Sequence, residues 1–189
     1  MAATREAARP VFQGFRPVIF VTVGSSAPFD RLVRAVDAWA GVRGRRDVFA
    51  QIGSSRYAPK NMQAVRLLDP KEFRQRVHSA KVVVAHAGMG SIIMALEIGK
   101  PIIVLPRRAH LNETRNDHQF ATAKEFERLR GIVVAFDEQE LLLKLDQADI
   151  ANDASPISTE ASPLLIDTVR TFISGVELTK PGSQRKTKI

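Results

Sequence analysis

Two glycine-containing segments follow runs of apolar, β-branched residues and offer hydrogen-bond donors to an anion. They are Gly24–Ser26 and His86–Ser91, the second with the sequence HAGMGS. Glycine lets backbone N–H groups approach an anion closely. A helix that begins near Met89 would direct its unpaired N–H groups and the positive end of its dipole at the same point. Ser91 adds a hydroxyl donor and His86 a ring that can change protonation state, so the second segment predicts a seat for a diphosphate.

The same pattern also fits a turn that binds nothing, because turns favour Gly and Ser for their backbone geometry alone. The second segment lacks the third glycine of the dinucleotide-binding G-x-G-x-x-G pattern, and no Gly-Lys-Ser/Thr follows it as in a P-loop. A histidine at the end of a strand is also more often structural than functional. Residue types alone therefore leave both interpretations open.

A second polar cluster runs from Pro106 to Gln119, directly after another apolar run. A long polar loop that leads into a helix can give many hydrogen bonds to a polyol such as a sugar. The alternative is a solvated surface loop in which Asp117 caps the following helix. The polar residues of this cluster are Arg107, Arg108, His110, Asn112, Glu113, Arg115, Asn116, Asp117, His118 and Gln119.

Apolar runs alternate with amphipathic segments along most of the chain and supply the framework for both clusters. Strands that alternate with helices at short connections favour a doubly wound, Rossmann-like α/β fold with a parallel sheet covered on both faces. In such a fold, ligands bind outside the carboxyl ends of the strands, where both clusters fall. The expected strands are residues 18–24, 47–53, 64–69, 81–88, 101–106 and 132–136, and the expected helices are 28–40, 69–80, 90–100, 116–131 and 137–145.

Several residues mark the expected helix ends. Gly41 stands beyond the end of the first helix, and Asp69 precedes Pro70 as the N-cap of the second. Asn116 or Asp117 is expected to cap the fourth helix.

The alternation predicts one domain over residues 18–145, preceded by a flexible lead-in, 1–17. The polar, proline-containing segment 146–161 is typical of a linker. An amphipathic helix is expected at 162–175 and a flexible basic tail at 176–189.

The composition is that of an ordinary globular chain with a basic surface. Its 189 residues are 44% hydrophobic and 25% charged, with a net charge of +8. This charge suits nucleic acid, anionic lipid or phosphorylated ligands. With one Tyr and one Trp, the chain lacks the aromatic–basic interleaving of single-strand binders, so no nucleic-acid partner is expected. The chain has no Cys, which excludes disulfides, and no segment reads as a secretory signal or a membrane span.

Together, the two clusters resemble glycosyltransferase family 28. The sequence HAGMGSIIMALEIGKPIIVLPRR, preceded by VTVGSSAPFDRLVRAVD and followed by NDHQ, is similar to the donor-binding, C-terminal half of GT-B glycosyltransferases. It looks most like the small catalytic subunits of two-chain UDP-sugar transferases. These act in dolichol-linked oligosaccharide synthesis in eukaryotes and as exopolysaccharide glucuronosyltransferases in bacteria. The resemblance covers residues 18–145, which it implies to be a nucleotide-sugar-binding domain.

The resemblance implies a role for each cluster. At one point the chain departs from the family, because Met94 stands where relatives carry a ribose-binding glutamate. Glu97 is then the remaining candidate for the ribose contact, the alternative being an ion on the helix surface. The implied donor-diphosphate ligands are Gly24, Ser25, Ser26, His86, Gly88, Met89, Gly90 and Ser91. The implied donor-sugar ligands are Arg107, Arg108, Asn116, Asp117, His118 and Gln119.

The resemblance further implies inverting transfer from a UDP-sugar to a polyprenyl-linked acceptor. GT-B enzymes work between two domains, so the acceptor site and the general base are expected in a membrane-anchored partner that holds this chain at the cytoplasmic face of the membrane. The helix at 162–175 either docks on that partner or packs on its own domain. No Asp-x-Asp pair occurs, and no metal or other cofactor is expected.

The donor sugar is expected to be glucuronic acid or GlcNAc. Arg107 and Arg108 suit a glucuronate carboxylate, which favours the former. Two other functions stay open: a non-catalytic nucleotide-sugar-binding module, and a UDP-sugar epimerase, which would need both domains in one chain.

Overall fold

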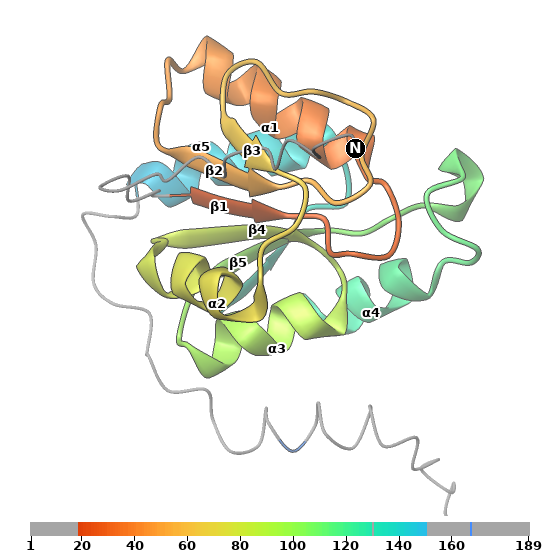
Figure 1. Ribbon diagram of the computed structural model, residues 1–189. Helices are drawn as coiled ribbons and strands as arrows, with labels where there is room; N and C mark the ends of the chain where they lie inside the picture. Colours follow the sequence, from red (N-terminus) through yellow and green to blue (C-terminus); the bar gives the residue numbers. More distant parts are fainter. Residues whose placement is uncertain (1–18, 130, 151–166, 168–189) are drawn as a thin grey trace, which may run out of the picture.

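The computed structural model describes residues 19–129, 131–150 and the single position 167. Six strands form one sheet in the order β3-β2-β1-β4-β5-β6, and every neighbouring pair is parallel (Figure 1). This arrangement confirms the doubly wound α/β fold. The strands are β1 (Ile19–Thr22), β2 (Val48–Gln51), β3 (Gln63–Val65), β4 (Val82–His86), β5 (Ile102–Leu105) and β6 (Ile132–Val134).

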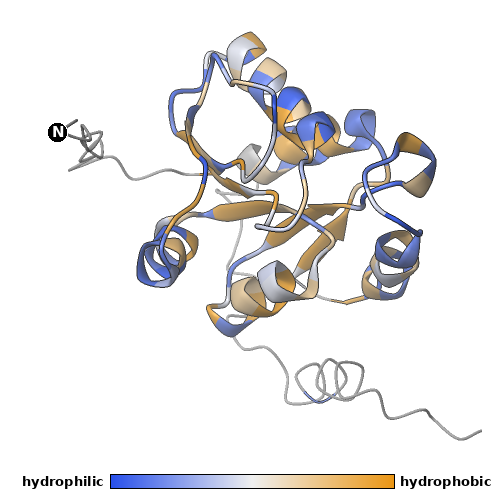
Figure 2. Cartoon of the chain, turned by 45° about the vertical axis from the view of Figure 1, so that its right-hand side comes forward, coloured by the Kyte–Doolittle hydropathy of each residue, from blue (hydrophilic) through white to orange (hydrophobic). Residues whose placement is uncertain are grey.

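Helices cover both faces of the sheet. Alternate residues of β1 point to opposite faces, so Val21 joins the core under α1 and α5 while Phe20 joins the core under α2, α3 and α4. In Figure 2 the strands are mostly hydrophobic and the helices carry hydrophilic residues on part of their surface. The helices are α1 (Asp30–Val42), α2 (Pro70–Ser79), α3 (Met89–Glu97), α4 (His118–Phe126) and α5 (Glu138–Ile150), with a 3-10 turn, η1 (Ala109–Leu111).

Glycines outside the helices end α1 and α3. Helix α1 continues through Gly41 to Val42, so the expectation that Gly41 lies beyond the helix was wrong. The left-handed residue is Gly44, with a φ of +63°, and its N–H bonds the carbonyl of Gly41. Gly99, with a φ of +70°, ends α3 in the same way. A side chain at position 41 would collide with Asn61, which explains why glycine is found inside the helix.

The domain continues further than the sequence predicts. Helix α5 extends to Ile150, so residues 146–150, which the sequence assigns to a linker, are helical. The contact that holds this part of the helix is long-range, because the carboxylate of Asp146 accepts hydrogen bonds from Trp39 Nε1 at 2.8 Å and from Arg43 Nε at 2.9 Å. The lead-in 1–17, the rest of the linker, the helix 162–175 and the tail 176–189 lie outside the described residues, apart from position 167.

A buried carboxylate on α1 shapes the connection between β2 and β3. Asp37 is 1% exposed and accepts hydrogen bonds from Tyr57 Oη at 2.7 Å and from the N–H groups of Asn61 at 2.7 Å and Lys60 at 3.0 Å. Burial acts to raise the pKa of Asp37, but these bonds hold that pKa below its ordinary value. This loop therefore has a fixed shape beside the carboxyl edge of the sheet.

We expect Asp37→Ala to lower the free energy of unfolding by about 3 kcal/mol, because it leaves buried donors unpaired. Tyr57→Phe is the matched control. It removes one of the bonds to Asp37 and should cost about 1 kcal/mol. Urea denaturation at neutral pH measures both values, and equal losses for the two variants would contradict this role of Asp37.

Candidate functional site at the carboxyl edge of the sheet

The two glycine-containing segments meet at the carboxyl edge of the sheet, on the right in Figure 1. The segment Gly24–Ser26 leaves β1, and His86–Ser91 leaves the neighbouring strand β4. Gly53, which follows β2, also lies close, since a Cβ built on it would be 2.8 Å from the carbonyl oxygen of Gly24. Gly24 and Gly53 have φ values of +76° and +54°, so both turns need the left-handed backbone that glycine allows.

The ring of His86 fills the space between Gly24 and Gly88. A Cβ built on either glycine would lie 2.7 Å from Cε1 of this ring, and the one on Gly88 would be closer still to Nε2. Neither position can hold a side chain while the ring keeps its place. His86 therefore sets the separation of the two segments by its volume.

Electrostatics keep the ring of His86 neutral. Burial, and to a smaller extent the positive charge of Arg107, lower the pKa of His86 from its ordinary value of 6.5 to about 4. Its Nδ1 atom is buried with no hydrogen-bond partner among the described residues. The expected change of protonation state thus falls outside the neutral pH range, and any contact of His86 with an anion at pH 7 involves an uncharged ring.

The N-terminus of α3 is open for a ligand. Gly88 is the N-cap residue and has no side chain to bond the first turn, and that turn carries no acidic residue. The N–H of Ser91 bonds the carbonyl of Gly88 at 3.1 Å, whereas the N–H groups of Met89 and Gly90 have no partner in the part of the chain that the structure describes. The positive end of the helix dipole and two free donors coincide here, as the sequence predicts.

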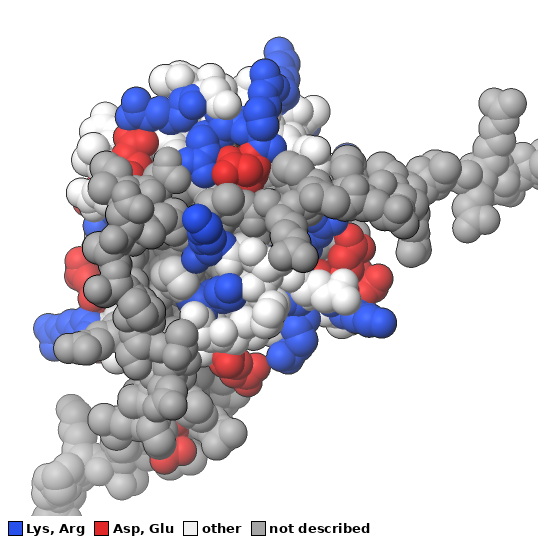
Figure 3. All heavy atoms as spheres, turned by 90° about the vertical axis from the view of Figure 1, so that its left-hand side faces the viewer, with Lys and Arg blue, Asp and Glu red and all other residues white. Residues whose placement is uncertain are grey.

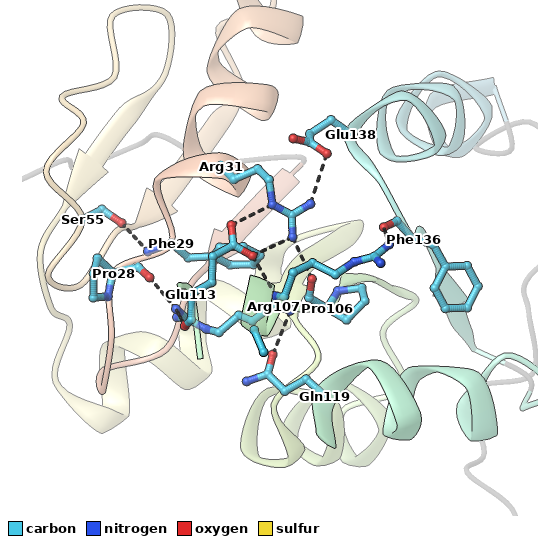
Figure 4. A network of polar contacts seen from close by, with 12 residues as sticks. Pro28, Phe29, Arg31, Ser55, Pro106, Arg107, Glu113, Gln119, Phe136 and Glu138 are labelled. Carbon is cyan, nitrogen blue, oxygen red and sulfur yellow. Dashed lines mark hydrogen bonds and ion pairs between the residues drawn. The ribbon is translucent and has the colours of Figure 1, made fainter. Parts of the chain in front are cut away.

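Arg107 occupies a different place from the one that the sequence suggests. Arg107 is 3% exposed, and its terminal nitrogens donate to the carbonyl oxygens of Val23 at 2.9 Å and Ala27 at 2.8 Å. They also donate to the carbonyl oxygens of Pro28 and Glu113, which are labelled in Figure 4. A guanidinium held by four carbonyl groups inside the protein is unsuited to bind a sugar or a diphosphate directly. We therefore assign Arg107 a structural place beneath the site.

A second guanidinium holds the loop after β5. Arg31 forms a two-pronged ion pair with Glu113, with N–O distances of 2.7 and 2.8 Å, and bonds Glu138 at 3.1 Å and the carbonyl of Pro106 at 2.8 Å (Figure 4). The side chains of Arg31 and Glu113 are only 12% and 11% exposed. This partly buried network joins α1, the loop after β5 and α5, and gives that loop a fixed base.

The other predicted sugar ligands lie on and after this loop. Arg108 is also engaged, because it donates to the carbonyl of Phe136 at 2.6 Å and lies over the ring of Phe120. Gln119 Oε1 accepts from the N–H of Arg107 at 3.2 Å, which leaves its amide nitrogen available. The carboxylate of Asp117 accepts from Ala109 N–H at 2.9 Å.

Asn116 and His118 are exposed, and their side chains contact each other at the start of α4. Asp117 is the N-cap residue of α4, but its side chain makes no cap bond. Its carboxylate fastens the loop to η1 instead of bonding the helix.

The structure separates Glu97 from the site. Glu97 is the last residue of α3, about 12 Å along the axis from Met89 at 1.5 Å per residue. Its side chain is 52% exposed and pairs with Arg74 of α2 at 3.9 Å. These observations favour the alternative, an ion on the helix surface, over the ribose contact. Met94 is partly buried against the apolar core.

Sequence reasoning missed Arg31 and Ser55. Ser55 is buried after β2, and its hydroxyl accepts the N–H of Phe29 at 3.1 Å, which fixes the start of α1. The only signal for Arg31 is a cation in the first turn of a helix, where a basic residue is unfavourable unless it has a partner.

No metal-binding group of three His, Cys, Asp or Glu side chains occurs among the described residues. None of the helices described is long and apolar enough to cross a membrane.

Residues 18–162 match the family model of the glycosyltransferase family 28 C-terminal domain. The chain belongs to this family. The matched region contains both glycine segments and the whole loop after β5, so the resemblance drawn from the sequence is confirmed.

A relative of this family 28 domain is the mouse UDP-N-acetylglucosamine transferase subunit ALG13. It is 33% identical over 120 residues, which cover 58% of this chain and 10% of that protein. The chain therefore spans about a tenth of the length of this relative. A solution NMR structure of ALG13 has a TM-score of 0.56 at 20% identity, covering 82% of this chain and 98% of that one.

The glycotransferase of kitacinnamycin has the same fold over part of its length. Its crystal structure has a TM-score of 0.54 at 21% identity, covering 90% of this chain and 42% of that one. At these identities the two structures show the fold alone.

We expect the pKa of His86 to make stability fall in acid. The unfolded chain binds a proton below pH 6.5 and the folded chain only below about pH 4, so stability is lost as pH falls through this window. The difference corresponds to about 3 kcal/mol. His86→Gln should remove this part of the loss in denaturant titrations between pH 8 and 4. His78→Gln, at an exposed position, should keep this loss of stability. If the unfolding free energy fell equally steeply with pH in the wild type and in both variants, the assignment to His86 would be refuted.

Gly88 and Gly90 provide a matched pair of substitutions. Gly88→Ala puts a methyl group into the ring of His86 and should cost about 2 kcal/mol or more of unfolding free energy. Gly90→Ala meets no atom within 4 Å and should leave stability unchanged or raise it by up to about 1 kcal/mol, because alanine favours a helix. Thermal denaturation distinguishes the two, and similar melting temperatures would contradict the steric role of His86.

Proposed function

We propose that this chain is the donor-binding catalytic subunit of an inverting glycosyltransferase that uses a UDP-sugar. The observation that carries the proposal is the open N-terminus of α3 beside two glycine turns, in a chain of the family 28 C-terminal domains. The name of the mouse relative, a UDP-N-acetylglucosamine transferase subunit, supports both the class of donor and the need for a second subunit.

The physical task of this site is to stabilise the diphosphate that leaves the sugar. In this proposal the N–H groups of Met89 and Gly90, the hydroxyl of Ser91 and the dipole of α3 act on that charge. The Gly24–Ser26 segment lies beside them and adds backbone and hydroxyl donors. Such preorganised donors need no metal ion or other cofactor to act on the leaving group.

GlcNAc is the first candidate for the donor sugar, with glucuronic acid as the second. The mouse relative is named for UDP-N-acetylglucosamine. The argument for glucuronic acid from Arg107 and Arg108 loses its support, because both guanidinium groups are held by carbonyl oxygens. Arg115 is exposed on the same loop and is the remaining cation there for a carboxylate. Asn116, Asp117, His118 and Gln119 are the proposed contacts to the sugar hydroxyls.

The partner in this proposal is a membrane-anchored subunit that binds a polyprenyl-linked acceptor and supplies the general base. It would hold the chain at the cytoplasmic face of the membrane. The net charge of +8 suits a location near anionic lipid. Figure 3 shows basic side chains beside acidic and uncharged ones on the visible part of the opposite edge.

Calorimetry with uridine, UMP and UDP tests the donor site. We expect affinity to rise with each phosphate, and Ser91→Ala to weaken UDP binding about tenfold, since it removes one hydrogen bond to a charged group. Ser79→Ala, at the exposed end of α2, is the control and should bind UDP as the wild type does. Equal affinities for uridine and UDP would refute a diphosphate site.

A transfer assay with radiolabelled donors tests the reaction. The chain is co-expressed with a candidate partner and is given a polyprenyl-diphosphate-linked sugar together with labelled UDP-GlcNAc or UDP-glucuronic acid. Transfer to the lipid fraction is expected with one of the two donors, and Arg115→Gln should impair it only if that donor is UDP-glucuronic acid. Conversion of UDP-GlcNAc without an acceptor would indicate an epimerase. Tight UDP binding without turnover would indicate a non-catalytic module.

A further inference from the structure

The buried guanidinium of Arg107 is connected to both sides of the Gly24–Ser26 segment. Its acceptors include the carbonyl of Val23, directly before the segment, and those of Ala27 and Pro28, directly after it. It also lies 4.7 Å from the centre of the Phe29 ring. One side chain therefore holds the segment at both ends.

These bonds leave the middle of the segment facing away from the protein framework. At its start, the N–H of Gly24 bonds Thr22 Oγ1 at 3.2 Å, and after its end the N–H of Phe29 bonds Ser55 Oγ at 3.1 Å. Between these points, the N–H groups of Ser25 and Ser26 have no partner within the described residues, and both residues are exposed. A turn fixed at its ends with free donors in the middle is suited to an anion.

Arg107 itself belongs to the loop after β5 and also bonds residues further along it. Its N–H donates to Gln119 Oε1 at 3.2 Å, and its side chain donates to the carbonyl of Glu113 at 3.3 Å. Glu113 is in turn held by Arg31. Arg107 therefore connects two parts of the proposed site. One is the Gly24–Ser26 segment, which is proposed to face the diphosphate, and the other is Gln119, which is proposed to face the sugar.

We propose that Arg107 is a positioning residue that fixes the Gly24–Ser26 segment in the shape that receives the donor diphosphate. The inference rests on the proposed function, because it takes the diphosphate as the ligand of that segment. Arg107 acts through the backbone and does not touch the ligand. Its charge also acts on the neutral His86 ring and adds a positive potential for the anion.

Arg107→Lys and Arg107→Met test the proposal by the binding of UDP and of uridine, which has no phosphate. Lysine keeps the charge but cannot reach four carbonyl groups at once, so UDP affinity should fall about tenfold, and methionine should lower it about a hundredfold. Uridine affinity, followed by NMR titration, should stay within about twofold of the wild type, since only the phosphate segment has changed.

Trp39→Phe is the matched control for stability. It removes the bond to Asp146, which joins the far end of α1 to α5, and should lower the melting temperature while leaving UDP affinity unchanged. Parallel loss of UDP and uridine binding in Arg107→Lys would reduce Arg107 to a general structural role and overturn the proposal. Unchanged UDP affinity in Arg107→Lys would overturn it as well.

Hydrogen exchange separates this inference from the proposed function. If the wild type binds neither UDP nor uridine, the proposed function fails, and the amides of residues 25–27 still report on Arg107 without a ligand. These amides should exchange faster in Arg107→Lys than in Trp39→Phe when each variant is measured at the same number of degrees below its own melting temperature. Equal exchange rates in the two variants would overturn the positioning role.

Discussion

Strands of a parallel sheet end in loops whose carbonyl groups have no neighbouring strand to pair with, and a buried carbonyl without a donor is costly. In this chain the guanidinium of Arg107 meets that constraint for two loops at once, through Val23, Ala27, Pro28 and Glu113. The arrangement of these loops at the carboxyl edge of the sheet depends on it. The turn after β1, the start of α1 and the loop after β5 all adjoin this one cation, and Arg31 reinforces the same junction from the other side of Glu113.

The layers of the fold follow from local signals in the sequence. Continuous β-branched runs identify the buried strands β1, β4 and β5, and the Asp69–Pro70 pair marks the start of α2, where Asp69 bonds Glu72 N–H at 2.8 Å. Helix ends are less visible, because Gly41 is explained only by Asn61, which packs on it from a distant loop. The extent of α5 likewise depends on a contact of Asp146 with Trp39, more than 100 residues earlier.

The glycine turns and the open helix N-terminus are also readable from the sequence, because each needs only its own neighbours. The roles of the cations are not. Arg107 and Val23 are 84 positions apart, and Arg31 and Glu113 are 82 apart, so no spacing rule connects them. Residue type predicts a ligand-binding role for Arg107, whereas burial places it within the protein framework. His86 shows the same effect, since its burial and a nearby cation decide its charge.

The contact of His86 with Gly88 means that these two positions form one steric unit. A smaller residue at position 86 would release the volume that a methyl group at position 88 requires, so the effects of changes at the two sites are not additive. Position 24 follows a different rule, because its left-handed backbone would still penalise a side chain after the space had been freed. Redesign of this edge must therefore treat positions 86 and 88 as a pair and keep glycine at position 24.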